Sequence, residues 1–226
     1  SKKKIRSLYL RSNIYNKKIS PSIISSLDYC PSPYFLDSFI KYDKKKINIG
    51  DYSLNKIWDN KNLKGKDYKN LNSFFWLFSL DLKSSKKDTQ EVILQWIDRN
   101  HSYNPKSWEF DIAAKRIIAW TSNSRLTYED SNTNYKDNFN RVIKKQVNHL
   151  INEIERSEWI DDKMIGCAAI ILAGLSYYDK DQHLKKGLSL LKKLIKYSFD
   201  NDGFPKSRNI KQLCFYLKYF ILIREW

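Results

Sequence analysis

The sequence feature that most constrains the fold is a predicted helix without a polar face. Residues Lys163 to about Tyr178 are helix-forming, and the run Ile165–Leu175 consists of apolar and small residues. A helix that is apolar all round must be enclosed by other parts of the protein. The run is too short to span a bilayer, and its glycines and alanines would let neighbouring helices approach closely. The sequence therefore predicts a core built around one buried helix.

Amphipathic helical patterns lie on both sides of this apolar stretch. From Asn70 to the C-terminus, apolar residues recur at the three- and four-residue spacing of helices, beginning with Leu71, Phe74 and Phe78. Asp88 and Glu91 have the spacing of a capping box, and Ser107 is a predicted N-cap. The later predicted helices are the one behind Asp88, Trp108–Ser122, Asn134 to about Arg156, one from Asp181 and one from Ile210.

These patterns predict a mainly α fold. No strand-like alternation follows Asn70, and helices joined by short loops pack antiparallel to one another. One enclosed helix among amphipathic ones indicates an inner and an outer layer, as in an α/α array. A compact helical bundle fits the periodicity nearly as well.

The first part of the chain, residues 1–69, is predicted to be an irregular N-terminal arm. Pro21, Pro31, Pro33 and Gly50 interrupt any long helix in it. Its short apolar pieces would pack on the helical part, residues 70–226. We therefore expect one helical domain with an arm packed on it, and no independent N-terminal domain.

The chain is strongly basic. Lys and Arg number 41 against 25 Asp and Glu, so the formal charge is 41 − 25 = +16. Such a charge suits nucleic acid or an acidic polysaccharide as a partner. The basic residues are scattered as pairs and triplets, however, and no nucleic-acid motif is present. We therefore do not expect nucleic acid as the partner, and an anionic polymer of another kind, such as an acidic polysaccharide, is equally consistent with this surface.

Several classes of protein are excluded by what the sequence lacks. Three cysteines without a CxxC spacing and three histidines without HxxxH predict neither a disulfide framework nor a metal site. The signatures GxSxG, GxxxxGK[ST], GxGxxG and HExxH are missing, so we expect no cofactor. We also expect no transmembrane segment, and no signal peptide is visible.

One candidate site lies on a predicted helix stripe. Trp108, Ile112, Arg116 and Trp120 recur every four residues, which places them on one slowly rotating face. An arginine between two tryptophans is suited to a cleft in which indoles stack on sugar rings and the guanidinium holds a carboxylate. In the alternative interpretation, the tryptophans are core residues and Arg116 extends to a carboxylate at the surface.

Two further groups carry possible chemistry. In Asn148-His149, the imidazole lies one helical turn from Glu153, which could orient it, or His149 is a satisfied structural histidine. Arg208 and Asn209 end a polar loop, where they could bind an anion or cap the following helix. The chain also has 15 tyrosines, none of which is favoured as a proton donor or base.

Taken in chain order, these segments resemble the heparinase II/III-like family over roughly Asn55 to Trp226. The matching pieces are Phe74–Leu80 (FxWLxxL in the family), Trp96-Ile97, Trp108-Glu109, Arg116, Trp120, Ala168–Leu175 (a small-residue helix ending in AGL) and Asp202–Asn209 (DGG-x-x-SRN). Phe204 stands where the family usually has a second glycine.

The resemblance implies an incomplete, alginate-lyase-like α/α toroid followed by a C-terminal β-sandwich domain. Family enzymes are polysaccharide lyases that cleave uronic-acid-containing glycans, such as heparin or alginate, by β-elimination, commonly in the periplasm or outside the cell. Because the β-sandwich contributes catalytic groups, we expect it to lie beyond these residues and the present chain to be inactive alone.

The resemblance also implies roles for single residues. β-Elimination requires that the uronate carboxylate be neutralised and that a base remove the neighbouring proton. Asn148 and His149 look like the family's catalytic Asn-His pair, although Val147 stands where the lyases usually have another Asn. The substrate-binding residues implied are Trp108, Arg116, Trp120, Arg208 and Asn209.

Three hypotheses follow, of which the lyase domain leads, and each predicts a different geometry. A lyase domain predicts a cleft that brings together Trp108, Arg116, His149 and Arg208. A non-catalytic carbohydrate- or envelope-associated helical module predicts the same helices with these side chains dispersed or buried. A nucleic-acid-binding protein predicts a continuous convex lysine face.

Overall fold

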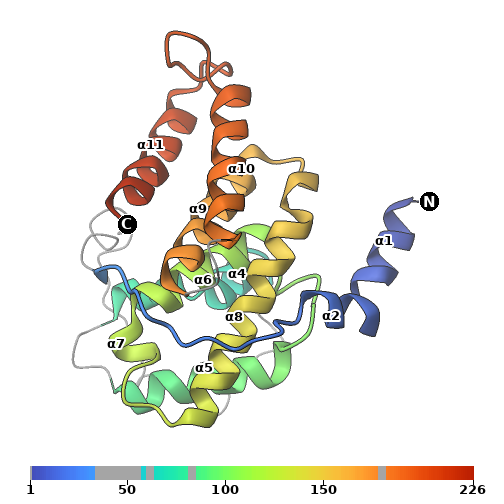
Figure 1. Cartoon of the computed structure of the whole chain (residues 1–226), viewed down its shortest axis with the longest axis vertical. Coiled ribbons are helices and arrows are strands. Elements are labelled where there is room, and N and C mark those ends of the chain that lie inside the picture. The colour runs from blue at the N-terminus through green and yellow to red at the C-terminus, as the bar shows by residue number, and fades with distance from the viewer. Residues whose placement is uncertain (1, 34–56, 60–63, 81–84, 178–181) are drawn as a thin grey trace.

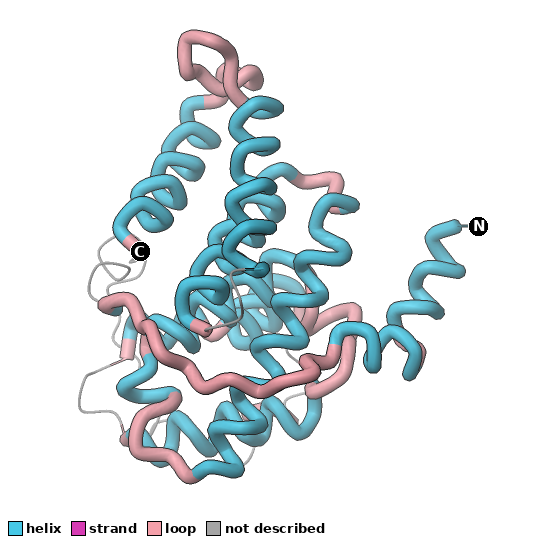
Figure 2. Tube along the Cα trace, viewed as in Figure 1, coloured by secondary structure: helices cyan, strands magenta, loops and turns pink. Residues whose placement is uncertain are grey.

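The computed structural model describes residues 2–33, 57–59, 64–80, 85–177 and 182–226. These ranges are mainly helical and contain no strand, as Figure 2 shows, apart from two isolated β-bridges that join Leu27 to Tyr177 and Phe199 to Pro205. The prediction of a mainly α fold is confirmed. The predicted interruption at Gly50 and the predicted helix start at Asp181 lie outside the described residues.

The helices follow one another along the chain with short connections in the C-terminal two thirds (Figure 1). Their bounds are α1 (Lys2–Leu10), α2 (Asn13–Ile19), α4 (Gly65–Ser73), α5 (Lys86–Asn100), α6 (Phe110–Ser122), α7 (Ser124–Thr127), α8 (Thr133–Glu153), α9 (Ile160–Ser176), α10 (Gln182–Ser198) and α11 (Ile210–Glu225), with 3₁₀ turns η3 (Phe75–Ser79) and η4 (Ile154–Arg156).

The apolar helix predicted from the sequence is α9, and it lies at the centre of the packing. It contacts α6, α8, α10 and α11, and every residue from Met164 to Ala173 is buried. The enclosure follows from composition, because no face of this segment carries the polar side chains that a solvated face needs.

Two glycines allow α9 and α10 to approach closely. A Cβ added at Gly174 in α9 would lie 2.4 Å from the backbone nitrogen of Leu184, and one added at Gly187 in α10 would lie 2.6 Å from Cγ1 of Ile171. Both distances are shorter than real contacts allow, so these positions require glycine. The prediction that small residues permit close approach is confirmed for this helix pair.

We expect Gly174→Ala to destabilise the protein by up to about 2 kcal/mol, measured as the free energy of unfolding in urea. The methyl group would overlap backbone atoms of α10, and overpacking typically costs about 1–3 kcal/mol. The higher helix propensity of alanine offsets about 1 kcal/mol of this cost. The matched control is Gly166→Ala, where the added Cβ would meet the Ile154 side chain, with Cδ1 and Cγ1 both at 2.9 Å, and no backbone atom of a neighbouring helix. Equal stability of the two variants would contradict the close-packing argument.

Two predicted helix starts are wrong by a few residues. The N-cap of α5 is Ser85, whose hydroxyl accepts a hydrogen bond from the backbone N–H of Asp88 at 3.3 Å, so no capping box forms at Asp88. The N-cap of α6 is Glu109, because the hydroxyl of Ser107 is engaged elsewhere and donates to Asn100 Oδ1 at 2.7 Å.

The apolar pattern beginning near Asn70 is divided between two elements. α4 ends at Phe74, whose φ of 57° lies in the left-handed region, and η3 follows. Phe74 is completely buried, and its ring lies 5.0 Å from Trp120 and 5.6 Å from Trp58 between centroids. Aromatic packing therefore holds this break in place, and periodicity alone gave no sign of it.

The N-terminal arm also differs from the irregular segment predicted for it. Residues 2–19 form α1 and α2, and the hydroxyl of Ser12 caps α2 by accepting from the N–H of Tyr15. Tyr15 and Ile19 are completely buried, and α2 contacts α8. The following loop runs across the helices, where the N–H of Asp28 donates to the carbonyl of Ser176 at 2.9 Å.

Candidate functional site

A pocket of about 430 Å³ opens between the first turns of α6 and α9 and the loop that precedes α6. This volume is in the range of sites for small ligands. We call it the Trp108 pocket; its lining residues are Leu10, Lys69, Tyr103, Pro105, Trp108, Glu109, Phe110, Asp111, His149, Trp159 and Asp162. Two residues predicted for the site, Trp108 and His149, therefore meet in one pocket.

Aromatic rings surround His149 in the wall of the pocket. Its imidazole is stacked on Phe110 at 5.7 Å with an interplanar angle of 23°, and it lies 5.0 Å from the ring of Tyr103 and 5.7 Å from that of Trp108. Trp159 contributes a fourth aromatic side chain and is 72% exposed. Trp108 and His149 are only 1% exposed, so they support the pocket from behind, and Trp159 is the accessible indole at its rim.

His149 is held as a neutral structural group. Its Nδ1 lies 2.7 Å from the hydroxyl of Tyr15, and its ring also hydrogen-bonds the backbone of Trp108. Burial lowers the pKa of His149 from 6.5 to about 3, and the nearby charge of Arg6 also lowers it. Because its pKa lies far below physiological pH and its Nδ1 is held by Tyr15, the ring takes up a proton poorly and is not suited to act as a general base.

Asn148 and Glu153, which lie near His149 on α8, bond to residues of other helices and not to the imidazole. The Nδ2 of Asn148 donates to the carbonyl of Ile19 at 2.9 Å, and its Oδ1 lies 3.1 Å from Nε2 of His183. Asn148 thereby links α2, α8 and α10. Glu153 forms an ion pair with Arg6 of α1, so it does not orient the imidazole as the helical spacing suggested.

Arg116 and Trp120 lie inside the core. Both are completely buried. The Arg116 guanidinium donates to the carbonyls of Asn72 at 2.7 Å and Ser107 at 3.0 Å, and to Gln146 Oε1 at 2.6 and 2.9 Å. Since these acceptors are neutral, burial dominates and lowers the pKa of Arg116. The interpretation of Arg116 and Trp120 as cleft-lining residues is therefore replaced by a structural one.

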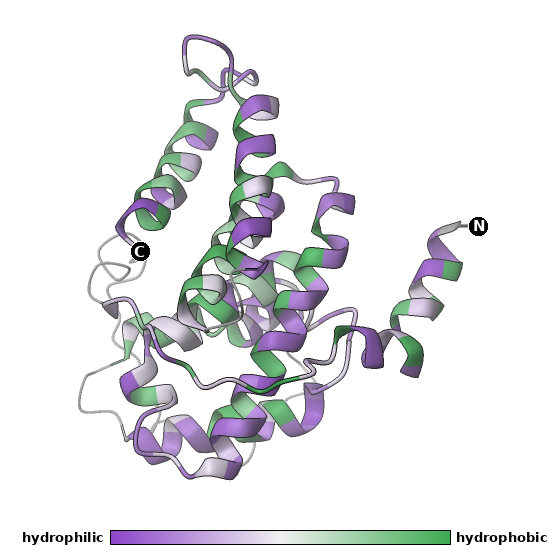
Figure 3. Cartoon of the chain, viewed as in Figure 1, coloured by the Kyte–Doolittle hydropathy of each residue, from purple (hydrophilic) through white to green (hydrophobic). Residues whose placement is uncertain are grey.

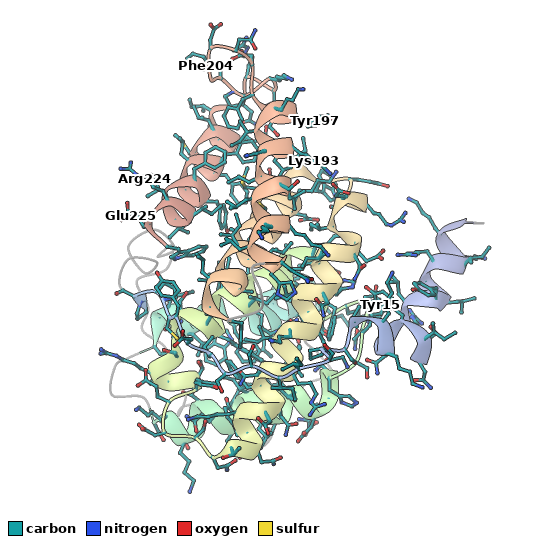
Figure 4. All side chains as sticks on the ribbon, viewed as in Figure 1. Tyr15, Lys193, Tyr197, Phe204, Arg224 and Glu225 are labelled. Atoms are coloured by element: carbon teal, nitrogen blue, oxygen red, sulfur yellow. The ribbon has the colours of Figure 1, made fainter. Side chains whose placement is uncertain are left out.

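Arg208 and Asn209 lie in the loop between α10 and α11, remote from the Trp108 pocket. Arg208 pairs with Asp200 at 2.7 Å, and Asn209 Oδ1 caps α11 by accepting from the N–H groups of Lys211 and Gln212. Figure 4 shows Phe204 of this loop at one tip of the molecule and Tyr15, the partner of His149, well away from it. Of the two sequence interpretations of this loop, helix capping agrees with the structure for Asn209.

The charged side chains at the pocket were not predicted as ligand-binding residues from the sequence. Lys69 pairs with Glu109 at 2.5 Å, and Lys115 lies 3.5 Å from Asp111. Asp162 accepts from Ser157 at 2.9 Å, and burial raises the pKa of its carboxyl. Asp111 and Asp162 lie in the first turns of α6 and α9. Acidic residues at this position are stabilised by the helix dipole. This first-turn position is the one sequence feature that distinguishes them.

The described residues contain neither a metal-binding group nor a membrane-spanning helix, and comparison with known proteins identifies no relative. In the part of the chain that the structure describes, no three His, Cys, Asp or Glu side chains are grouped to hold a metal ion. None of the described helices has both the length and the apolar character that crossing a bilayer requires. The chain matches no family model, no curated protein and no solved structure.

Proposed function

We propose that this chain is the helical, glycan-binding domain of a heparinase II/III-like protein. In this proposal it holds a sugar residue of an acidic polysaccharide in the Trp108 pocket and does not perform β-elimination by itself. The function corresponds to the non-catalytic module among the sequence hypotheses. The proposal rests on the pocket, in which aromatic side chains lie beside a rim of hydrogen-bonding groups.

The chemistry of the pocket suits a sugar ring. Indole and phenol faces pack on the apolar C–H face of a sugar, and Trp159 is exposed at the rim for that contact. Lys69 and the carboxylates of Glu109, Asp111 and Asp162 supply donors and acceptors for hydroxyl groups. The overall charge of +16 attracts the acidic polymer as a whole, and the pocket binds one of its sugar rings through the hydroxyl groups and the C–H face.

β-Elimination would need groups that the described part of the pocket does not provide. The carboxylate of a uronate must be neutralised, and Asn148, the residue matched to that task, is bonded to Ile19 and His183 instead. His149 is held by Tyr15 through Nδ1, and burial lowers its pKa to about 3. The lyase activity that the resemblance implies would therefore depend on residues from another domain.

The helix arrangement is compatible with the inner layer of an α/α toroid, and we keep that architecture as part of the proposal. The buried α9 contacts α10 along its length through the two glycine positions and also contacts α6 and α11. One enclosed helix covered by amphipathic helices is the pattern that the two-layer fold requires.

The proposal is tested by binding of heparin and alginate oligosaccharides to the purified chain, measured by calorimetry. We expect Trp159→Ala to weaken the affinity about fivefold or more, because an exposed indole that stacks on a ligand contributes roughly 1 kcal/mol or more. A matched control is Tyr197→Ala on α10, which removes a similarly exposed aromatic residue, 68% exposed, far from the pocket (Figure 4).

Two results would contradict the proposal. If Trp159→Ala and Tyr197→Ala bind the oligosaccharides as tightly as the unmodified chain, the pocket is not the glycan site. If the chain alone generates unsaturated uronate products, seen by their ultraviolet absorbance, the assignment as a non-catalytic module is wrong.

A further inference from the structure

The N-terminal helices carry an unusual charge distribution. Residues 1–27 contain seven Lys or Arg residues and no Asp or Glu, the first acidic residue being Asp28. Two of the cations are paired with the helical body, Arg6 with Glu153 and Lys3 with Glu158. Lys4, Arg11, Lys17 and Lys18 are exposed. The segment therefore presents a concentrated positive surface at one edge of the molecule.

The same segment exposes large aliphatic side chains. Ile5, Leu8 and Ile14 are 69%, 72% and 73% exposed. Figure 1 shows α1 projecting from the edge of the helical body, and Figure 3 shows hydrophobic and hydrophilic residues alternating along it. Single exposed aliphatic residues are ordinary on a protein surface, whereas several of them gathered on one segment mark an interaction site. The loop after α2 adds Ile23, which is 72% exposed.

We propose that α1 and α2 form a docking surface for a membrane that contains anionic lipids. The cations attract the negatively charged headgroups, and Ile5, Leu8 and Ile14 enter the boundary between headgroups and acyl chains. Helices with basic residues beside aliphatic ones bind membranes in this way, lying at the interface without crossing it.

The aliphatic side chains are what distinguish a lipid surface from a soluble polyanion. An acidic polysaccharide or a nucleic acid would pair with Lys17 and Lys18 but would leave Ile5 and Leu8 in water. A lipid surface satisfies both features at once, since it offers negative charge and an apolar layer below it. This inference is independent of the Trp108 pocket, which lies on other elements apart from Leu10.

The test is sedimentation of the whole chain with vesicles of phosphatidylcholine alone and of phosphatidylcholine mixed with phosphatidylglycerol. We expect binding to the anionic vesicles at low salt and little binding to the neutral ones. Ile5→Ser/Leu8→Ser should lower the affinity for anionic vesicles at least about tenfold, because each aliphatic side chain buried in the interface contributes about that factor. Heparin binding of this variant should remain within about twofold of the unmodified chain.

The matched control is Ile210→Ser/Leu217→Ser on α11, which makes the same replacements at residues 68% and 45% exposed. We expect its vesicle affinity to stay within about twofold of the unmodified chain. Equal loss in both double variants would overturn the proposal, since apolar contact would then not be specific to α1. Unchanged binding of Ile5→Ser/Leu8→Ser, together with loss in Lys17→Gln/Lys18→Gln, would identify a polyanion-binding surface instead. Circular dichroism of each variant checks that the fold is retained.

Discussion

Arg116→Ala is expected to destabilise the protein by at least about 3 kcal/mol, measured by urea unfolding. The substitution leaves the carbonyls of Asn72 and Ser107 and the side-chain oxygen of Gln146 without their donors, in a completely buried site. Each buried acceptor left unsatisfied costs about 1–3 kcal/mol, and the lost side chain opens a cavity. Since whole domains are stable by only about 5–15 kcal/mol, such a loss would remove roughly a fifth to more than half of the total free energy of unfolding.

Two further variants separate the causes of this loss. Arg141→Ala on α8 removes an exposed arginine, and we expect a change within about 0.5 kcal/mol. Arg116→Met keeps the apolar stem that packs beside Trp96, over whose ring the guanidinium lies at 4.0 Å, but it cannot donate. The free energy of unfolding of Arg116→Met should lie between those of Arg116→Ala and Arg141→Ala. If Arg116→Ala were no less stable than Arg141→Ala, Arg116 would not be the donor that joins α4, α6 and α8.

The Arg116 case shows what periodicity can and cannot predict. The four-residue recurrence of Trp108, Arg116 and Trp120 correctly indicates a helix, and α6 spans two of the three. It does not tell whether the stripe faces a cleft or the core, because that depends on distant segments. The acceptors of Arg116 include Asn72 and Gln146, which are 44 and 30 residues away in the sequence. Their convergence is a property of the folded chain.

The same limit applies to the pocket. Helices α5, α6, α8, α9, α10 and α11 follow from apolar patterns, and the enclosure of α9 follows from its composition. Asp111 and Asp162 are ordinary first-turn acids in the sequence, and only the packing of α6 against α9 brings them to one pocket. Tyr15 is similar, since nothing in an arm with several prolines indicated that its hydroxyl would reach His149.

Lowering the pH is expected to destabilise the protein through His149. Its pKa is about 3 in the folded chain and about 6.5 in the unfolded chain. Between these values the unfolded chain binds more protons, so the free energy of unfolding falls as the pH falls through this window. The contribution of this one residue is fully present above pH 6.5, and about 2 kcal/mol of it is lost at pH 5.

The measurement compares the unmodified chain with His149→Gln, in urea unfolding at pH 5 and pH 7. Glutamine can still accept from Tyr15 and donate to the backbone of Trp108, but it does not titrate, so the loss between pH 7 and pH 5 should be about 2 kcal/mol smaller in the variant. The pKa of the Asp162 carboxyl is raised in the folded chain, so its effect on the free energy of unfolding has the opposite sign. This effect is the same in the unmodified chain and in His149→Gln, and it cancels in the comparison. His101→Gln makes the same substitution at an exposed histidine and is the matched control. If His149→Gln kept the pH dependence of the unmodified chain, His149 would not be the buried neutral group that joins the N-terminal helices to the Trp108 pocket.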